Sequence, residues 1–226
     1  QPKSTIPYEA FANIALREKN FEEAITNFQK YIELDPKKGS FYIQLGNVYK
    51  QKGEMPLALL NFQKATRIEP KSVQAFENLA LLHLDLKRYD QAIKAYEKCI
   101  DLEPNNSYYL RSIAEVYIEK EDYDSAISYY NKAQEIDPNE YMIYNELGNC
   151  LVSKKEYEKG KEKFARAQEL GNEEVKSYAN KGLADLKKKQ RKYDEAIDLY
   201  KKAIDLYSSN QEARLGMANA YSKKGN

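Results

Sequence analysis

The sequence contains few of the residues from which catalytic and metal sites are usually built. Its 226 residues include one histidine, two cysteines and no tryptophan. Without a second histidine or a CxxC pair, a zinc site made of His and Cys is not expected, and no glycine-rich phosphate-binding loop occurs. No apolar run approaches the roughly 18 residues of a membrane-spanning helix. The net charge of +1 gives no general attraction to nucleic acid or to an anionic membrane.

The two cysteines bear on the cellular compartment. Cys99 and Cys150 are far apart and lie within helical patterns, so we expect two buried free thiols rather than a disulfide. Free thiols favour a reducing compartment such as the cytoplasm. The first residue is Gln rather than Met. We therefore expect a fragment or a processed form, and the lack of a targeting segment excludes nothing about the parent chain.

Proline, although sparse, recurs at a constant interval. The spacing is 34 residues, and an acidic residue precedes each of Pro36, Pro70, Pro104 and Pro138. Such an interval indicates one small unit repeated along residues 1–226 as a single array. Aligned on these prolines, the units occupy 5–38, 39–72, 73–106, 107–140 and 141–174. A sixth unit with two extra residues occupies 175–210, and a seventh, 211–226, has only a first helix.

Each unit has the pattern of two amphipathic helices. In the second unit one helix face carries Tyr42, Leu45 and Tyr49, and the next helix carries Ala58 and Phe62 at the same kind of spacing. Small residues at fixed places let the helices approach closely, and the aromatic side chain fills the space beside them. The proline ends the second helix, because it cannot continue it. One pair cannot bury its own apolar faces, so the pattern predicts an all-α fold, an α-solenoid of stacked antiparallel helix pairs.

The pattern Tyr42-x2-Leu45-Gly46-x2-Tyr49, Ala58-x3-Phe62, Pro70 resembles the tetratricopeptide repeat, with Tyr42 in place of the usual Trp. The resemblance covers nearly the whole chain, as an array of about six and a half repeats. It implies a right-handed superhelix whose first helices line a concave groove. It implies little about function, because a common fold hosts many activities.

The array becomes irregular after residue 170. Gly171 and Asn172 replace the acidic-Pro pair, and we expect Gly171 to adopt a left-handed helix cap. Ala196 lies 36 rather than 34 residues after Gly160. The two extra residues are expected around 187–192, where they lengthen either the first helix of the sixth unit or its inner turn.

Two features bear on possible chemistry. His83 stands where other units carry Tyr49 and Tyr117, so we expect it to pack rather than to catalyse. No nucleophile has a base at a useful spacing, and we expect neither catalysis nor a cofactor.

The second feature is a basic patch of Lys187, Lys188, Lys189, Arg191 and Lys192. It either binds phosphate groups or an acidic protein, or forms a solvated segment whose cations suit a helix C-terminus.

The resemblance also indicates a peptide-binding groove, because exposed first-helix positions of the family face the ligand. The candidates form a mixed polar and apolar surface: Asn13, Ile43, Asn47, Glu77, Asn78, Tyr108, Arg111, Glu115, Met142, Asn145 and Asn149. Side-chain amides can hydrogen-bond a peptide backbone whatever its sequence, although Asn at these places also follows the family's ordinary preference. The three cations that hold a terminal carboxylate in chaperone-binding members are missing, which argues against a co-chaperone of that class.

These observations favour a noncatalytic scaffold or adaptor that binds an extended peptide or a helix of a partner protein, and no nucleic acid. Two alternatives stay open. In the first alternative, the chain is the substrate-recruiting array of a larger enzyme, such as a glycosyltransferase with such repeats. Otherwise it assembles with copies of itself through the C-terminal repeats, where the unpaired last helix would expose an apolar face around Met217 and Tyr221.

Overall fold

The computed structural model describes residues 6–225, so Thr5 and Asn226, the predicted ends of the first and last repeats, lie outside the described residues. Between these limits the chain forms thirteen α-helices and no strand. In chain order the helices are α1 Ile6–Arg17, α2 Phe21–Leu34, α3 Gly39–Lys52, α4 Met55–Ile68, α5 Val73–Asp85, α6 Tyr89–Leu102, α7 Ser107–Glu119, α8 Tyr123–Ile136, α9 Met142–Ser153, α10 Tyr157–Leu170, α11 Glu173–Lys189, α12 Tyr193–Leu206 and α13 Gln211–Lys224.

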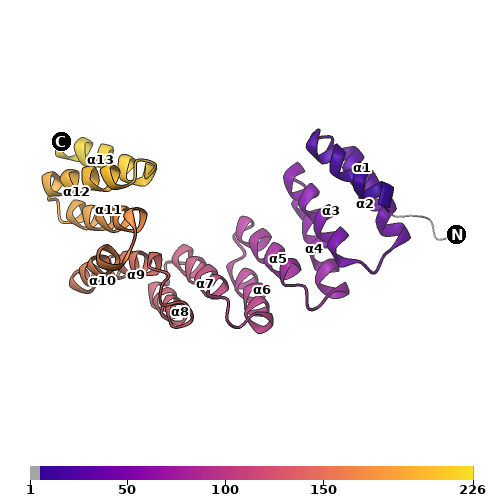
Figure 1. The fold of residues 1–226 in the computed structure, drawn as a ribbon, viewed down its shortest axis with the longest axis horizontal. Coiled ribbons are helices and arrows are strands. Elements are labelled where there is room, and N and C mark those ends of the chain that lie inside the picture. Colours follow the sequence, from indigo (N-terminus) through magenta and orange to yellow (C-terminus); the bar gives the residue numbers. More distant parts are fainter. Residues whose placement is uncertain (1–5, 226) are drawn as a thin grey trace. The chain divides into compact units, whose positions relative to one another are not determined.

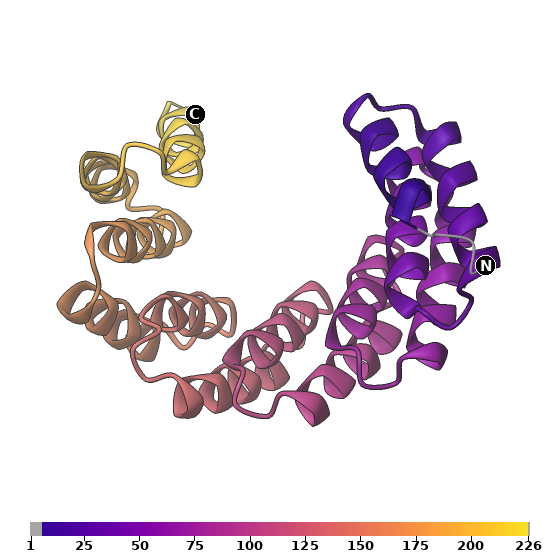
Figure 2. The ribbon, with the colours of Figure 1, turned by 45° about the vertical axis from the view of Figure 1, so that its right-hand side comes forward.

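The helices pack as consecutive pairs within two compact units. The N-terminal unit ends at Val116 and the C-terminal unit begins at Tyr117, so the boundary falls within α7. In the N-terminal unit α1 pairs with α2, α3 with α4 and α5 with α6, and each pair packs on the next. In the C-terminal unit α9 pairs with α10 and α11 with α12, and α13 packs on α12. Within each unit the stacking in sequence order can be followed in Figures 1 and 2, and it is that of an α-solenoid.

A repeated aromatic residue holds each pair together. One lies in each second helix and is at most 1% exposed: Phe28, Phe62, Tyr96, Tyr130, Phe164 and Tyr200. Small residues face these rings. A Cβ atom added to Gly46 would lie 2.6 Å from Cε1 of Phe62, and one added to Gly148 would lie 2.5 Å from Cε1 of Phe164. The close helix approach predicted from the small residues is therefore confirmed.

The turns also follow the repeat. The acidic-Pro pairs end the second helices: α2 stops at Leu34, before Asp35, whose backbone N–H donates to the carbonyl of Tyr31. Inside each pair one residue of the turn is left-handed. It is a glycine only at Gly53, with φ 84°; elsewhere an L-residue with a side chain takes this conformation: Lys19, Lys87, Glu121, Lys155 and Arg191.

The irregular repeat differs in a way that the sequence showed only in part. The helix α11 has 17 residues, whereas the other first helices have 12 to 14. Gly182 still faces Phe164, as Gly148 does, so the two extra residues lengthen the C-terminal half of α11. The inner turn, residues 190–192, keeps three residues.

The prediction for Gly171 is wrong. Its backbone is extended, with φ −84° and ψ 164°. A side chain is excluded there for another reason, because an added Cβ would lie 2.3 Å from Cγ1 of Val175. The next residue, Asn172, caps α11 by accepting a hydrogen bond from the backbone N–H of Val175 at 2.9 Å. This cap starts α11 after a connection of only two residues.

The last helix, α13, occupies the place of a first helix on α12. It packs through small residues, and an added Cβ at Gly216 would lie 2.5 Å from Cε1 of Tyr200. Tyr221 is 49% exposed and Leu215 is 74% exposed, whereas Met217 is partly buried against the core. The exposed apolar side chains of α13 are therefore Leu215 and Tyr221, and the expectation that Met217 is exposed is wrong.

Candidate functional site

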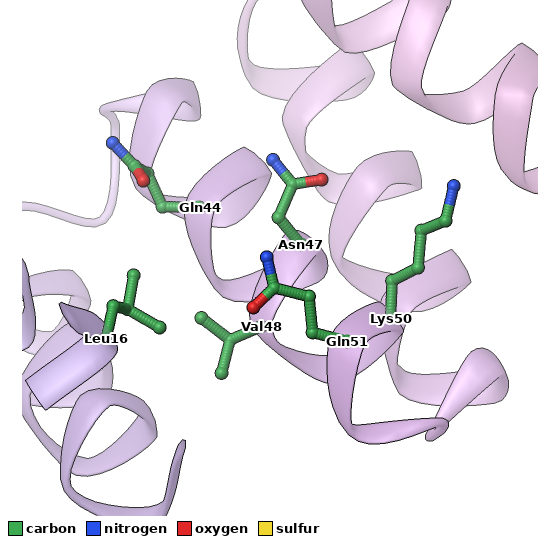
Figure 3. Close-up of a pocket in the computed structure, with 6 residues that line it drawn as sticks. All are labelled: Leu16, Gln44, Asn47, Val48, Lys50 and Gln51. Carbon is green, nitrogen blue, oxygen red and sulfur yellow. The ribbon is translucent and has the colours of Figure 1, made fainter. Parts of the chain in front are cut away.

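The N-terminal unit has a pocket on its first-helix face, by which we mean the surface formed by α1, α3, α5 and α7 up to Val116. The pocket has a volume of about 460 Å³. Its lining consists of Leu16 from α1 and five residues of α3: Gln44, Asn47, Val48, Lys50 and Gln51. Figure 3 shows the polar side chains projecting from the same side of α3, while Val48 points towards Leu16. The spacing of three and four residues explains this, because such residues share one helix face.

The amide groups of this pocket are not used by the fold. Within the described residues the side chains of Gln44, Asn47 and Gln51 have no hydrogen-bond partner, and the same holds for Asn13, which is not among the lining residues. Other amides are used: those of Asn27, Asn61, Asn78 and Asn180 each donate to the carbonyl four residues earlier in their own helix, at 2.8 to 2.9 Å. The pocket therefore presents free amide donors and acceptors beside apolar side chains.

One edge of the pocket is fixed by an ion pair between neighbouring first helices. Nζ of Lys50 lies 2.6 Å from Oδ2 of Asp85, which joins α3 to α5. Both side chains are about a third or more exposed, so the pair adds little to stability. It does hold the Lys50 side chain along the rim of the pocket.

The first-helix face continues over α5 and α7 with charged and aromatic groups. Tyr108 is 43% exposed and packs edge-on against Tyr109, with ring centroids 5.2 Å apart. Burial and the neighbouring Glu77 raise the pKa of the Tyr108 hydroxyl, so it stays protonated. Arg111 lies 4.0 Å from Glu115 on the same helix. Of the predicted groove residues of this unit, the structure thus brings Asn47, Glu77, Tyr108, Arg111 and Glu115 to one surface.

Two predicted groove residues lie in the core instead. Ile43 is 3% exposed and belongs to the hydrophobic cluster of α1 to α5. Asn145 is 1% exposed, and its Nδ2 donates to the carbonyl of Val175 at 3.0 Å and to Sδ of Met142 at 3.7 Å. Asn145 therefore links α9 to α11, and neither residue is exposed for a ligand.

The remaining groove candidates belong to the C-terminal unit. Met142 lines a separate pocket of about 550 Å³, together with Tyr141, Leu170 and Val175. Asn149 is half-buried, and its side chain has no hydrogen-bond partner among the described residues. These two residues form no part of the pocket on α3.

The basic patch is largely neutralised by neighbouring carboxylates. Lys187 forms an ion pair with Glu195, and Nζ of Lys192 lies 3.6 Å from the same carboxylate. Nζ of Lys188 lies 2.7 Å from Oδ1 of Asp185. Only Lys189 and Arg191 have no carboxylate partner within the described part of the chain. This pattern favours a solvated segment over a phosphate-binding site.

Asp185 is the centre of this network. Burial opposes its ionisation, but hydrogen bonds from Lys188 and Tyr200 and the charge of Lys181 hold its pKa below the ordinary value. Lys181 also lies 2.9 Å from Glu212 at the start of α13. The network therefore joins α11, α12 and α13.

The single histidine and the two thiols are packed residues. His83 is 7% exposed, and burial lowers its pKa. Cys99 and Cys150 are free and buried, as predicted, and burial raises the pKa of each thiol to about 12.

Over residues 6–225 no cluster of three potential metal ligands occurs. Over the same residues no helix has the length and apolarity needed to span a bilayer.

Asn47 is the one lining residue of the α3 pocket among the groove candidates given above, and Leu16, Val48 and Gln51 were not expected in a groove. Gln51 had a detectable signal, since it lies four residues after Asn47 and therefore on the same helix face. Leu16 had none, because an apolar residue on an amphipathic helix is ordinarily assigned to the core.

Family models described as tetratricopeptide or TPR repeat match most of the chain. The matched residues are 7–38, 46–87, 71–139, 114–174 and 184–225. No curated protein sequence matches the chain.

Several solved structures share the fold at low sequence identity. The C-terminal part of a TPR repeat-containing protein from Cytophaga hutchinsonii has a TM-score of 0.74 at 18% identity, covering 95% of this chain and 88% of that one. MamA from Desulfovibrio magneticus has a TM-score of 0.63 at 22% identity, with 74% and 94% covered. YrrB, described as a TPR protein with an unusual peptide-binding site, has a TM-score of 0.58 at 20% identity, with 82% and 95% covered.

Proposed function

Since the chain belongs to the tetratricopeptide repeat family, we propose that it is a noncatalytic protein-interaction scaffold whose α3 pocket binds an extended segment of a partner protein. The repeat architecture supports the scaffold role, because stacked repeats offer long continuous binding surfaces. The description of YrrB supports peptide binding by a protein of the same fold.

The free amides of the α3 pocket carry this proposal. An extended peptide leaves its backbone N–H and C=O groups without partners, whereas each Asn or Gln side chain offers both a donor and an acceptor. Gln44, Asn47 and Gln51 offer these groups along one side of α3, and none of them is needed by the fold. Leu16, which is only partly buried, would receive an apolar side chain of the ligand.

The pocket is also preorganised. Its polar side chains stand on a helix whose opposite face is fixed by buried Phe41, Leu45 and Gly46. Peptide binding therefore requires little further ordering of the protein backbone. This favours affinity, because the cost of ordering a binding site reduces the net free energy of binding.

The absence of catalysis is part of the proposal and rests on the state of the reactive groups. A thiol attacks as the thiolate, and both thiols are buried with pKa values raised to about 12. His83, the one imidazole of the chain, is buried at 7% exposure.

The test is a selection of peptides that bind the whole chain. A random peptide display library is selected on the wild type, and the enriched peptides are measured by fluorescence anisotropy against N47A/Q51A. We expect affinity to fall about tenfold, since two hydrogen bonds at roughly 0.5–1.5 kcal/mol each are lost. The matched control is Q91A/N131A, which removes two exposed amides from second helices. Equal affinity of the selected peptides for both double variants would refute this site.

A further inference from the structure

The helix α4 departs from every other second helix on its outward surface. Leu57 is 38% exposed and Leu60 is 43% exposed. Where α4 has these two leucines, the other second helices carry only polar residues: Glu23 and Thr26, Gln91 and Lys94, Ser125 and Ser128, Lys159 and Glu162, Glu195 and Asp198. The repeat itself therefore does not require leucine here.

The charges of α4 depart in the same way. Its second residue is Pro56, where the others have Glu22, Asp90, Asp124, Glu158 and Asp194. Near its end it has Arg67, where the others have Glu33, Asp101, Glu135, Glu169 and Asp205. The helix α4 thus has no acidic residue between Met55 and Ile68, and its outward surface carries two cations, Lys64 and Arg67.

These cations lack the carboxylate partner that two other second helices, α6 and α10, supply. In α6 Lys98 lies 2.9 Å from Asp101, and in α10 Arg166 lies 2.6 Å from Glu169, each pair three residues apart. The corresponding pair in α4 is Lys64 and Arg67, and neither has a carboxylate partner within residues 6–225. An acidic group from outside would therefore meet two positive charges without a carboxylate partner, although Nζ of Lys64 lies over the Tyr42 ring, 5.8 Å from its centroid.

The leucines line a groove of about 520 Å³ between α4 and α2. Tyr42, Leu45 and Tyr49 of α3 also line it, and Ile32 contributes from α2. Its two amides are already engaged: Nδ2 of Asn61 donates to the carbonyl of Leu57 at 2.8 Å, and Nε2 of Gln29 donates to the hydroxyl of Tyr49 at 3.4 Å.

This composition decides the shape of the occupant. An extended segment would leave backbone groups unsatisfied over an apolar surface whose amides are engaged, which is costly. A helix satisfies its backbone internally and needs only an apolar stripe, so it suits such a groove. Glu33 lines the α2 wall and Lys64 the α4 wall. The acidic residues of the helix must therefore lie on its α4 side.

We propose that the groove between α2 and α4 binds an acidic amphipathic helix of a partner protein, with apolar residues over Leu57 and Leu60 and carboxylates over Lys64 and Arg67. This site is separate from the α3 pocket, because it lies on second helices and uses apolar contacts and charge instead of free amides. The array would then hold two different partner segments at once.

The proposal is tested with a display library of alanine-based helical peptides of about 20 residues, roughly 30 Å long, with one face randomised. Selection on the whole chain should enrich apolar residues at helical spacing flanked by Glu or Asp. In L57Q/L60K, which installs the α6 residues, affinity for the enriched peptides should fall at least tenfold. In R67D it should also fall, and replacing the peptide's acidic residues by Lys should restore binding to that variant. Enrichment of neutral or basic helices would overturn the proposal.

Two controls distinguish binding in this groove from binding in the α3 pocket and from self-association. N47A/Q51A should bind the helical peptides as the wild type does, and L57Q/L60K should keep the extended peptides selected for the α3 pocket, so the two sites can fail independently. Sedimentation of the wild type and of L57Q/L60K checks for a second copy in the groove. A wild-type dimer that becomes monomeric in L57Q/L60K would assign the groove to self-association and overturn the proposed partner. Far-UV circular dichroism confirms that each variant is folded.

Discussion

Replacing Asn145 by Ala should destabilise the C-terminal unit, although the sequence suggested a ligand-binding role for this residue. Asn145 is 1% exposed and donates to the carbonyl of Val175 at 3.0 Å. Its loss removes this hydrogen bond, worth about 0.5–1.5 kcal/mol, together with the packing of a buried side chain. At about 2 kcal/mol, the melting temperature should fall by about 4–8 °C for a chain of this size.

The assay is thermal and urea unfolding followed by far-UV circular dichroism, with two comparison variants. Asn149→Ala, on the same helix but half-buried and without a hydrogen bond, should change stability by less than about 0.5 kcal/mol. Asn145→Leu keeps most of the side-chain volume but cannot donate, so it should be destabilised nearly as much as the alanine variant. The reasoning fails if Asn145→Ala and Asn149→Ala melt together, or if Asn145→Leu is as stable as the wild type.

Three further outcomes follow from the packing and the titrations. Gly182→Ala should lower stability by about 1–3 kcal/mol, because an added Cβ would lie 2.3 Å from Cε1 of Phe164. Combining it with Phe164→Leu should recover part of the loss in a double-mutant cycle, and strict additivity would argue against the contact. Burial lowers the pKa of His83, so the folded state binds a proton on this imidazole less readily than the unfolded chain does. The free energy of unfolding should therefore decrease as pH falls through the pKa of His in the unfolded chain, about 6.5. His83→Tyr, the residue that other repeats have there, should therefore flatten the fall in urea stability between roughly pH 7 and pH 5, and an unchanged slope would contradict this. Both thiols should resist a thiol-reactive dye in the native protein at neutral pH and react on unfolding, because their pKa values are raised to about 12; rapid native labelling would speak against their burial.

The sequence predicted the helix pairs, their order and the residues that pack between the paired helices, because those features repeat. A ring such as Phe62 and the small residue facing it must recur wherever two helices approach closely, so a constant spacing reveals them without any knowledge of long-range contacts. The acidic-Pro turns are equally local, since proline ends a helix wherever it stands.

The site was predicted less well, because exposure depends on the neighbouring repeat. Asn145 stands at the repeat position of Ile43, Glu77 and Arg111, and the two-residue connection before α11 brings the carbonyl of Val175 to it. That connection depends on the missing side chain at Gly171, where the sequence pattern had suggested a left-handed cap. The leucines of α4 were visible by comparing second helices with one another. They were overlooked because family resemblance directs attention to the first helices.

The network around Asp185 has a consequence for how α13 opens in the chain of 226 residues. A linear stack has no contacts beyond its nearest neighbours, so its terminal helices open first. The small residues of α13 bury little apolar surface, and Lys181 joins Glu212 at its start to the carboxylate of Asp185. These ion pairs therefore contribute to holding the start of α13 in place, and salt weakens such contacts. Ionic strength should thus act as a control on fraying at the C-terminal end, and amide exchange in α13 should accelerate with added salt while exchange around Phe62 does not.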